Sequence, residues 1–444
     1  MTAEGSLPRD QVRGDWDAQL DANDSRERWF DPWLTVDQPA ANAIVADIMV
    51  HYEHNLWPLR RRRPTDAERA NTEAAVRIIV ANLAASCLDG KPGAVAISRQ
   101  ANSNKRTRYD SPRLATIHAV VDQLSETFQG GQGVRLQASA KRGKVSTVRA
   151  GPQVADRLAA LSEDAFSQMP GRELIWLRYR PEASGGRRPK GELIDYTETG
   201  PTTSMRADVE RINSTLRRAD IRLRGDTGAR PAGPLPPLCR YFVVRSLGDE
   251  SFDGCGRLFG GWWQGLERNR RADLRVNGEP IADLDFSSMF LRLAYLEANA
   301  APPDGDLYAG LRDLEDPRWR EGIKQITASL FSRSVPLQRR PANMAGKLPD
   351  GMTGREVRDR LLERHPILAP VMEAGLGLRL MFLESQTLVA SLLALSDKGV
   401  PALPMHDGLM VATSRADAAR NAMSAASRSM LGMELPIILK SFAY

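Results

Sequence analysis

Cysteine is scarce in this 444-residue chain, which contains three copies, Cys87, Cys239 and Cys255. They are odd in number and scattered, and no C-x-x-C pair occurs, so they supply neither a disulfide framework nor a zinc cluster. His51 and His54 have the helical spacing of a metal-binding pair, but no third ligand lies near them in the sequence. These absences favour a reducing compartment and a pair of ordinary surface or core histidines.

Long apolar runs are also absent. No continuous apolar stretch reaches the roughly 20 residues needed to cross a bilayer. The first residues, Met-Thr-Ala-Glu-Gly-Ser, lack the basic and apolar segments of a signal peptide. We therefore predict a cytoplasmic protein with no membrane partner.

The excess of basic residues is modest, because 61 Lys+Arg against 55 Asp+Glu give a net charge of +6. Their placement is more informative. Arg60–Arg63 form an unbroken run, and Arg268, Arg270 and Arg271 lie close together in the sequence. Guanidinium groups bind phosphate oxygens in a bidentate way, so these clusters favour a polyanionic partner such as nucleic acid.

Residues 1–160 are predicted to form a helical and winged-helix-like accessory module. Thr65 and Glu68 have capping-box spacing at the start of a helix that runs to about Cys87. After a second helix, two alternating strands flank the basic segment 141–144. This order is typical of a winged helix, in which the hairpin tip contacts DNA phosphates. A solvated hairpin is the alternative.

Residues 161–235 are expected to be a connecting, thumb-like segment that ends in the Pro/Gly-rich linker 227–237. Residues 236–444 would then form the catalytic part of the chain.

The segment Ile281-Ala-Asp-Leu-Asp-Phe286 alternates like a strand, which puts Asp283 and Asp285 on one face. From Ser288 onward the pattern becomes helical and mostly apolar. A carboxylate at the end of a strand that leads into a buried helix is well placed to bind a metal ion. The alternative is a solvent-facing aspartate before a helix that is N-capped by Ser287.

A second carboxylate lies in the segment 400–411, which is predicted to be a strand, a tight turn and a strand. His406, Asp407 and Gly408 form the turn. Two aspartates on neighbouring strands can hold two Mg²⁺ ions roughly 3.5–4 Å apart, which is the arrangement that transfers nucleotidyl groups.

These two motifs resemble those of a known family. The sequence D-F-S-S-M-F-L-R, which begins at Asp285, resembles the D-[YF]-S-x-x-x-x-R signature of family A DNA polymerases. His406-Asp407-Gly408 resembles the H-D-E motif of that family, with Gly408 in place of glutamate. The resemblance covers roughly residue 256 to the C-terminus, with gaps.

The resemblance implies a fold and a metal site. The fold would be α+β, a right-hand polymerase palm with helical fingers inserted at about 310–375, related to that of phage-type single-subunit polymerases. Asp285, Asp407 and the backbone carbonyl of Phe286 would hold two Mg²⁺ ions, for which Mn²⁺ could substitute.

Between the two aspartates, Arg320 and Lys324 are four residues apart and project from one helix face. The resemblance implies that they hold the triphosphate of the incoming nucleotide, with Ser287 also in the nucleotide site. A solvated basic helix face is the alternative. The aromatic residues that the family has on this helix are Ala328 and Ser332 here, so Phe331 is the candidate to stack on the base.

Phe290 occupies the position at which the family usually has a glutamate that excludes the ribose 2′-OH. A phenylalanine is bulky enough to exclude that hydroxyl sterically, and this favours synthesis of DNA. A core position for Phe290 is the alternative.

Primer and template contacts are predicted at several positions. These residues are His406, Gln386, Gln264, Arg257, Arg270, Arg271, Lys141, Arg142 and Lys144.

The sequence predicts a template-directed nucleotidyltransferase, a compact DNA polymerase of a phage, plasmid or integrated element. Its partners would be a DNA primer-template and nucleoside triphosphates. Residues 1–230 lack the spaced acids of a proofreading nuclease, so no 3′→5′ exonuclease is expected. Two alternatives stay open, a primase or primase-polymerase on the same palm and a non-catalytic DNA-binding replication protein.

Overall fold

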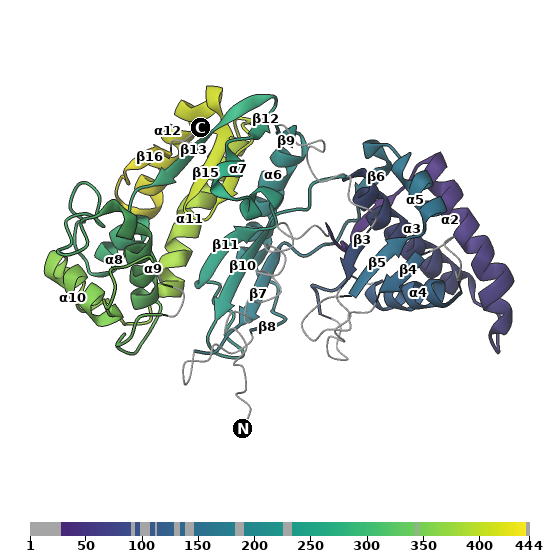
Figure 1. The fold of residues 1–444 in the computed structure, drawn as a ribbon, viewed down its shortest axis with the longest axis horizontal. Helices are drawn as coiled ribbons and strands as arrows, with labels where there is room; N and C mark the ends of the chain where they lie inside the picture. The colour runs from purple at the N-terminus through teal and green to yellow at the C-terminus, as the bar shows by residue number, and fades with distance from the viewer. Residues whose placement is uncertain are drawn as a thin grey trace. The chain divides into compact units, whose positions relative to one another are not determined.

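The computed structural model describes residues 28–89, 94–97, 107–111, 113–127, 134–137, 146–182, 191–224, 233–341, 344 and 346–440. Helices and strands are mixed along the chain, which confirms the predicted α+β class (Figure 1).

The chain divides into two compact units. Unit 1 comprises Met1–Leu174, Asp220–Pro237 and Gly260–Gly278, and unit 2 comprises Ile175–Ala219, Leu238–Phe259 and Glu279–Tyr444. This division differs from the predicted one, because the expected connecting segment 161–235 is shared between the two units. Its two strands and one helix between residues 175 and 219 belong to unit 2, which carries the two aspartates. Residues 260–278, which were predicted to be part of the catalytic segment 236–444, belong to unit 1.

Unit 1 contains a helical core and small sheets. Its described elements include β1 (Arg28–Trp29), β2 (Leu34–Val36), α2 (Pro39–His51), α3 (Asp66–Leu88), β3 (Ala94–Ile97), α4 (Leu114–Thr127), β4 (Val134–Gln137), β5 (Ser146–Ala150), α5 (Pro152–Ala159), β6 (Phe166–Gln168), β9 (Ile221–Leu223), α7 (Arg268–Arg271) and β12 (Leu274–Val276).

Helix α3 is at the centre of the unit 1 core. It begins with the predicted capping box, in which the Thr65 side chain accepts from the Glu68 backbone N–H and the Glu68 side chain accepts from the Thr65 N–H. Its apolar residues pack against α2, α4, α5 and β2. Asn82, which is fully buried on this helix, accepts from the backbone of Asp31 at 2.7 Å and donates to it at 2.9 Å.

The winged-helix-like prediction concerns the succession α3, β3, α4, β4 and β5. These strands form a sheet of order β1-β3-β5-β4, in which β5 is antiparallel to both β3 and β4. The predicted hairpin is therefore present. Its basic tip, with Lys141, Arg142 and Lys144, lies outside the described residues.

Unit 2 carries both aspartates. Its described elements include β7 (Ile175–Tyr179), β8 (Glu192–Leu193), α6 (Gly200–Arg217), β10 (Cys239–Val244), β11 (Cys255–Phe259), β13 (Glu279–Phe286), α8 (Met289–Glu297), α9 (Arg320–Phe331), α10 (Gly354–Arg364), α11 (Gly377–Ser396), β14 (Leu403–Met405), β15 (Gly408–Ala412), α12 (Ala416–Leu431) and β16 (Ile437–Lys440).

Two groups of strands organise unit 2. In the first, β10 pairs in parallel with β7 and antiparallel with β11, and β7 also pairs with β8. In the second, β13 pairs antiparallel with both β15 and β16, and β15 forms the predicted hairpin with β14. Because β13 has a partner on each side, the end of this strand is held firmly.

Helix α11 packs against α12, β11, α8 and α6. Among the described residues it is the one helix long and apolar enough to span a membrane, with a mean hydropathy of 1.4, and 50% of that apolar window is buried. Glu384, which is buried, also lies on it. We therefore interpret α11 as a core helix of unit 2.

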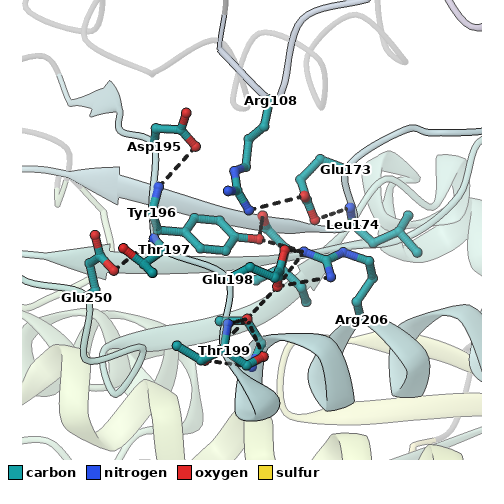
Figure 2. Close-up of polar contacts among 12 residues, drawn as sticks. Arg108, Glu173, Leu174, Asp195, Tyr196, Thr197, Glu198, Thr199, Arg206 and Glu250 are labelled. Carbon is teal, nitrogen blue, oxygen red and sulfur yellow. Dashed lines mark hydrogen bonds and ion pairs between the residues drawn. The ribbon is translucent and has the colours of Figure 1, made fainter.

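The start of α6 is fixed by polar contacts (Figure 2). Thr199 and Thr202 cap the helix reciprocally. Arg206 donates to Glu198 at 2.9 Å and to the Tyr196 hydroxyl at 3.1 Å, and this hydroxyl donates to the Ile175 carbonyl at 3.3 Å. The helix is thus attached to the first residue of β7.

Asn213 on α6 is predicted to be important for stability, because it is 2% exposed and exchanges two hydrogen bonds with the Leu238 backbone, at 3.0 and 2.8 Å. Asn213→Ala would leave two buried backbone groups without partners. We expect a loss of about 2 kcal/mol in the free energy of unfolding, measured by urea titration. Ser214→Ala, at the next and half-buried position, whose hydroxyl contacts Glu210 and Arg217 of the same helix, should change this free energy by less than about 0.5 kcal/mol. Equal effects of the two variants would contradict the prediction.

Candidate active site

Asp285 lies near the end of β13 and is 4% exposed. Its backbone is opposite Gly408 of β15 on one side and opposite Ile438 of β16 on the other. The alternation predicted from the sequence places Asp283, which is 3% exposed, on the same face of the strand. The two acids therefore point into one partly closed environment.

Asp407 lies in the turn between β14 and β15, and its backbone carbonyl accepts from the Phe286 N–H at 3.3 Å. The hairpin thus brings Asp407 beside the end of β13, as the sequence predicts. Burial, followed by the negative charge of Asp407, raises the pKa of Asp285 to about 7, against the influence of Lys440. Two adjacent carboxylates in a site with little water disfavour double ionisation.

Gly408, which follows Asp407, lies where β15 approaches β13 closely. A Cβ at this position would lie 2.4 Å from the Leu284 carbonyl oxygen and 2.6 Å from Asp285 Oδ1. Any side chain would therefore displace the backbone of β13 or the Asp285 carboxylate. Glycine is needed here because β13 and β15 approach closely at the carboxylate.

Lys440 is a site residue that sequence reasoning missed. Its ammonium lies 2.6 Å from Asp285 Oδ2, and its backbone is opposite Asp283. Burial disfavours the charge, but Asp285 and Asp283 outweigh burial and raise the pKa of Lys440. The signal in the sequence was a lone cation in the otherwise apolar strand β16.

The predicted phosphate-binding residues lie together on α9. Arg320 and Lys324 both contact the ring of Tyr308, at 5.4 and 5.6 Å from its centroid. Loss of water and the nearby Arg320 lower the pKa of Lys324, whereas Asp407 and Asp285 act in the opposite direction. The carboxylates are thus near enough to act on the charge of Lys324.

The alternative prediction, that Ser287 is the N-cap of the helix after β13, is wrong, because Ser288 and not Ser287 immediately precedes the helix. Helix α8 begins at Met289, and the preceding Ser288 has a left-handed backbone with a φ of 51°. Ser287 donates its N–H to the Pro436 carbonyl at 2.8 Å. Phe286, whose carbonyl is the predicted metal ligand, is 2% exposed.

Phe290 and Phe331 contact each other, with ring centroids 6.3 Å apart. Phe331 is 0% exposed, so the ring predicted to stack on a base is covered by the protein core. We assign Phe331 a packing role against Phe290. Phe290 is half-buried and retains some exposed surface.

The predicted primer and template residues of unit 2 have different surroundings. His406 is exposed at the hairpin turn, with its ring 6.4 Å from that of Phe259. Arg257 forms a bidentate ion pair with Glu384, with N–O distances of 2.7 and 3.0 Å. Gln386 accepts from Arg240 at 2.9 Å. The last two contacts attach α11 to β11 and β10, so Arg257 and Gln386 have structural roles within the unit.

The other predicted contacts belong to unit 1. Gln264 is buried and accepts from the Gly261 N–H at 3.2 Å. Arg270 pairs loosely with Asp273 at 3.7 Å, and Arg271 donates to the Leu266 carbonyl at 3.2 Å. DNA contacts by these residues remain predictions.

The residues at the end of β13 fit a Mg²⁺ site. Asp285 Oδ1 is buried and has no hydrogen-bond donor among the residues that the structure describes. Within the same residues, no group of three or more His, Cys, Asp or Glu side chains has metal-binding geometry. Mg²⁺ is often bound by one or two carboxylates together with substrate phosphates and water, so the pair Asp285 and Asp407 is sufficient on the protein side.

No protein-family model matches the chain, and no curated protein sequence matches it significantly.

The pKa of Asp285 predicts a pH dependence of stability. The pKa of an ordinary aspartate is 3.8, whereas the pKa of Asp285 is about 7. The folded chain therefore binds this proton more tightly than the unfolded chain does. The resulting stabilisation is complete below the pKa of the unfolded chain, 3.8, and is lost as the pH rises through the pKa of the folded chain, about 7.

Asp285→Asn removes this titration. In the presence of a metal chelator, as the pH rises from about 5 to about 8, the thermal midpoint of the wild type should fall relative to that of Asp285→Asn. For Asp417→Asn, a substitution at an exposed position, the plot of thermal midpoint against pH should run parallel to that of the wild type. Parallel curves for all three proteins would show that the Asp285 carboxyl titrates normally.

Proposed function

We propose that the chain is a template-directed nucleotidyltransferase, a compact family A-like DNA polymerase without a proofreading exonuclease. One observation carries the proposal. Asp285 and Asp407 meet at the end of β13, and the cations Arg320 and Lys324 share one face of α9 close enough for the carboxylates to act on Lys324. Paired acids beside paired cations suit a reaction in which a polyphosphate must be bound and cleaved.

In this proposal the strands β13, β14, β15 and β16 form the palm, and α9 and α10 belong to the fingers. Unit 1 is the accessory module that contacts DNA. The buried contacts of β13 with β15 and β16 hold the carboxylates in place, so that little reorganisation is needed during the reaction.

The side chains have separate tasks. Asp285 and Asp407, with the Phe286 carbonyl, would hold two Mg²⁺ ions. When bound, the ions would increase the acidity of the primer 3′-OH and neutralise the departing pyrophosphate. Arg320 and Lys324 bind the triphosphate and stabilise the charge that develops on it. Lys440, whose ammonium lies 2.6 Å from Asp285, favours the ionised form of this carboxyl and so opposes the effects of burial and Asp407.

Primer extension tests the proposal. Purified protein with Mg²⁺, dNTPs and a labelled primer-template should extend the primer. Asp285→Ala and Asp407→Ala should lower the rate by roughly a thousandfold or more, because the ligands of the metal ions are lost. Asp417→Ala, an aspartate that is exposed at the start of α12, is the matched control and should retain wild-type activity.

Two further arms complete the test. Without dNTPs the primer should stay intact, and shortening from its 3′ end would refute the absence of an exonuclease. With an unprimed single strand, products made de novo would favour the primase alternative. Metal-independent DNA binding without any nucleotide transfer would overturn the proposal and favour a binding protein.

Phe290 is predicted to control the choice of sugar. Phe290→Ala should relax the preference for dNTPs over rNTPs by about tenfold, because the ring no longer blocks the 2′-OH. The ratio of the two kcat/KM values measures this preference. Phe382→Ala, which removes a ring from α11 near Phe242, is the control and should leave the ratio unchanged. An unchanged ratio in Phe290→Ala would indicate a purely structural ring.

A further inference from the structure

The loop from Pro303 to Tyr308, between α8 and α9, is held by a buried arginine. Arg292 is 2% exposed, and it donates to three backbone carbonyls, those of Ser287 at 3.0 Å, Pro303 at 3.1 Å and Gly305 at 2.6 Å. Arg292 is also the arginine that closes the D-F-S-S-M-F-L-R motif. One side chain thus connects the turn after Asp285 with this loop.

A second anchor lies at the other end of the loop. Nε2 of His365 contacts the Leu307 carbonyl at 2.8 Å, and Nδ1 contacts the Tyr295 hydroxyl at 2.8 Å. A carbonyl can only accept, so Nε2 donates and Nδ1 accepts from the hydroxyl. The histidine is 0% exposed, and its burial lowers its pKa, which keeps it in this neutral form. The loop is therefore fixed at both ends.

Asp306 uses this rigid loop to hold Arg320. Its carboxylate accepts from Arg320 Nε at 3.0 Å and Nη2 at 2.9 Å, from Ser288 Oγ at 2.9 Å and from the Tyr308 N–H at 3.2 Å. Burial acts to raise the pKa of Asp306, but these donors outweigh it and lower the pKa, so the group stays ionised. The ion pair engages Nε and Nη2 of the guanidinium, which leaves the Nη1 donors out of the pair.

Tyr308 supplies the second support. It is 6% exposed, and its ring lies beside both Arg320 and Lys324, at 5.4 and 5.6 Å from the charged groups. An aromatic face attracts cations and limits the positions that long side chains adopt. Both phosphate-binding candidates therefore depend on the same short loop.

We propose that Asp306 and Tyr308 are positioning residues that direct Arg320 and Lys324 toward the polyphosphate tail of an incoming nucleoside triphosphate. This inference rests on the proposed function. Long cationic side chains lose rotamer freedom when they bind a phosphate, and a loop that orders them beforehand reduces this loss. The base and sugar have no part in the interaction, so its chemical target is the tail alone.

The test compares Asp306→Asn with Asp313→Asn in the full chain. Asp313 forms a similar pair, since its Oδ2 accepts from Arg360 Nε at 3.1 Å and Nη2 at 2.9 Å, but both residues are outside the site. Calorimetry with Ca²⁺, which is used to prevent turnover, measures the binding of a deoxynucleoside triphosphate and of inorganic tripolyphosphate. Asp306→Asn should lower the affinity for both ligands by the same factor, about tenfold, whereas Asp313→Asn should leave both affinities unchanged.

Tyr308 gives an independent arm in the same assay. Tyr308→Leu should lower the affinity for tripolyphosphate about threefold, and Tyr308→Phe, which keeps an aromatic ring, should retain most of the wild-type affinity. In primer extension by Asp306→Asn, KM for the nucleotide should rise more than kcat falls.

Unchanged tripolyphosphate affinity in Asp306→Asn would overturn the inference while leaving the proposed function intact. The inference would also fail if Asp306→Asn lowered the thermal midpoint and weakened primer-template binding as much as tripolyphosphate binding, because that pattern indicates a structural role. A wild-type chain that binds neither ligand would overturn the proposed function, and this inference with it.

Discussion

The burial of Asp285 beside Asp407 is the constraint on which the rest of unit 2 depends. A carboxylate that is 4% exposed is costly to ionise, and a second carboxylate nearby increases the cost. The chain offsets this cost with Lys440, whose ammonium lies 2.6 Å from Asp285. It also needs Gly408, because any side chain there would collide with β13. The site is thus a cluster of charges whose balance would change when substrate and cations enter.

The second half of the site follows from how the chain leaves β13. Ser288, which has a left-handed backbone, donates a hydrogen bond from its hydroxyl to the Asp306 carboxylate. Arg292 donates to the Gly305 carbonyl and so fixes the loop that contains Asp306. Asp306 in turn holds Arg320 on α9. The turn that follows Asp285 is therefore connected to the cation Arg320 through a series of buried or half-buried polar contacts, which helps two segments that are distant in sequence to keep a common geometry.

Local patterns predicted much of this arrangement. The alternation in β13, the hairpin around Asp407, the capping box of α3 and the four-residue spacing of Arg320 and Lys324 are properties of neighbouring residues, and each was found as predicted. Lys440, Asp306 and Tyr308 were not predicted, because their roles depend on contacts between distant segments. The assignment of Phe331 to base stacking failed for a related reason, since helical spacing cannot tell a ligand-facing ring from one that packs against Phe290. The palm assignment itself depends on the resemblance and remains a proposal.

The most direct test of the central claim is anomalous diffraction from crystals that contain Mn²⁺, primer-template and a non-hydrolysable nucleoside triphosphate. Two paired carboxylates that serve nucleotidyl transfer predict two Mn²⁺ peaks roughly 3.5–4 Å apart, each within bonding distance of Asp285 or Asp407. Asp285→Asn should remove at least one of them. Peaks only at other places on the protein, or the same two peaks in Asp285→Asn, would contradict the claim that these aspartates form a metal-dependent catalytic site.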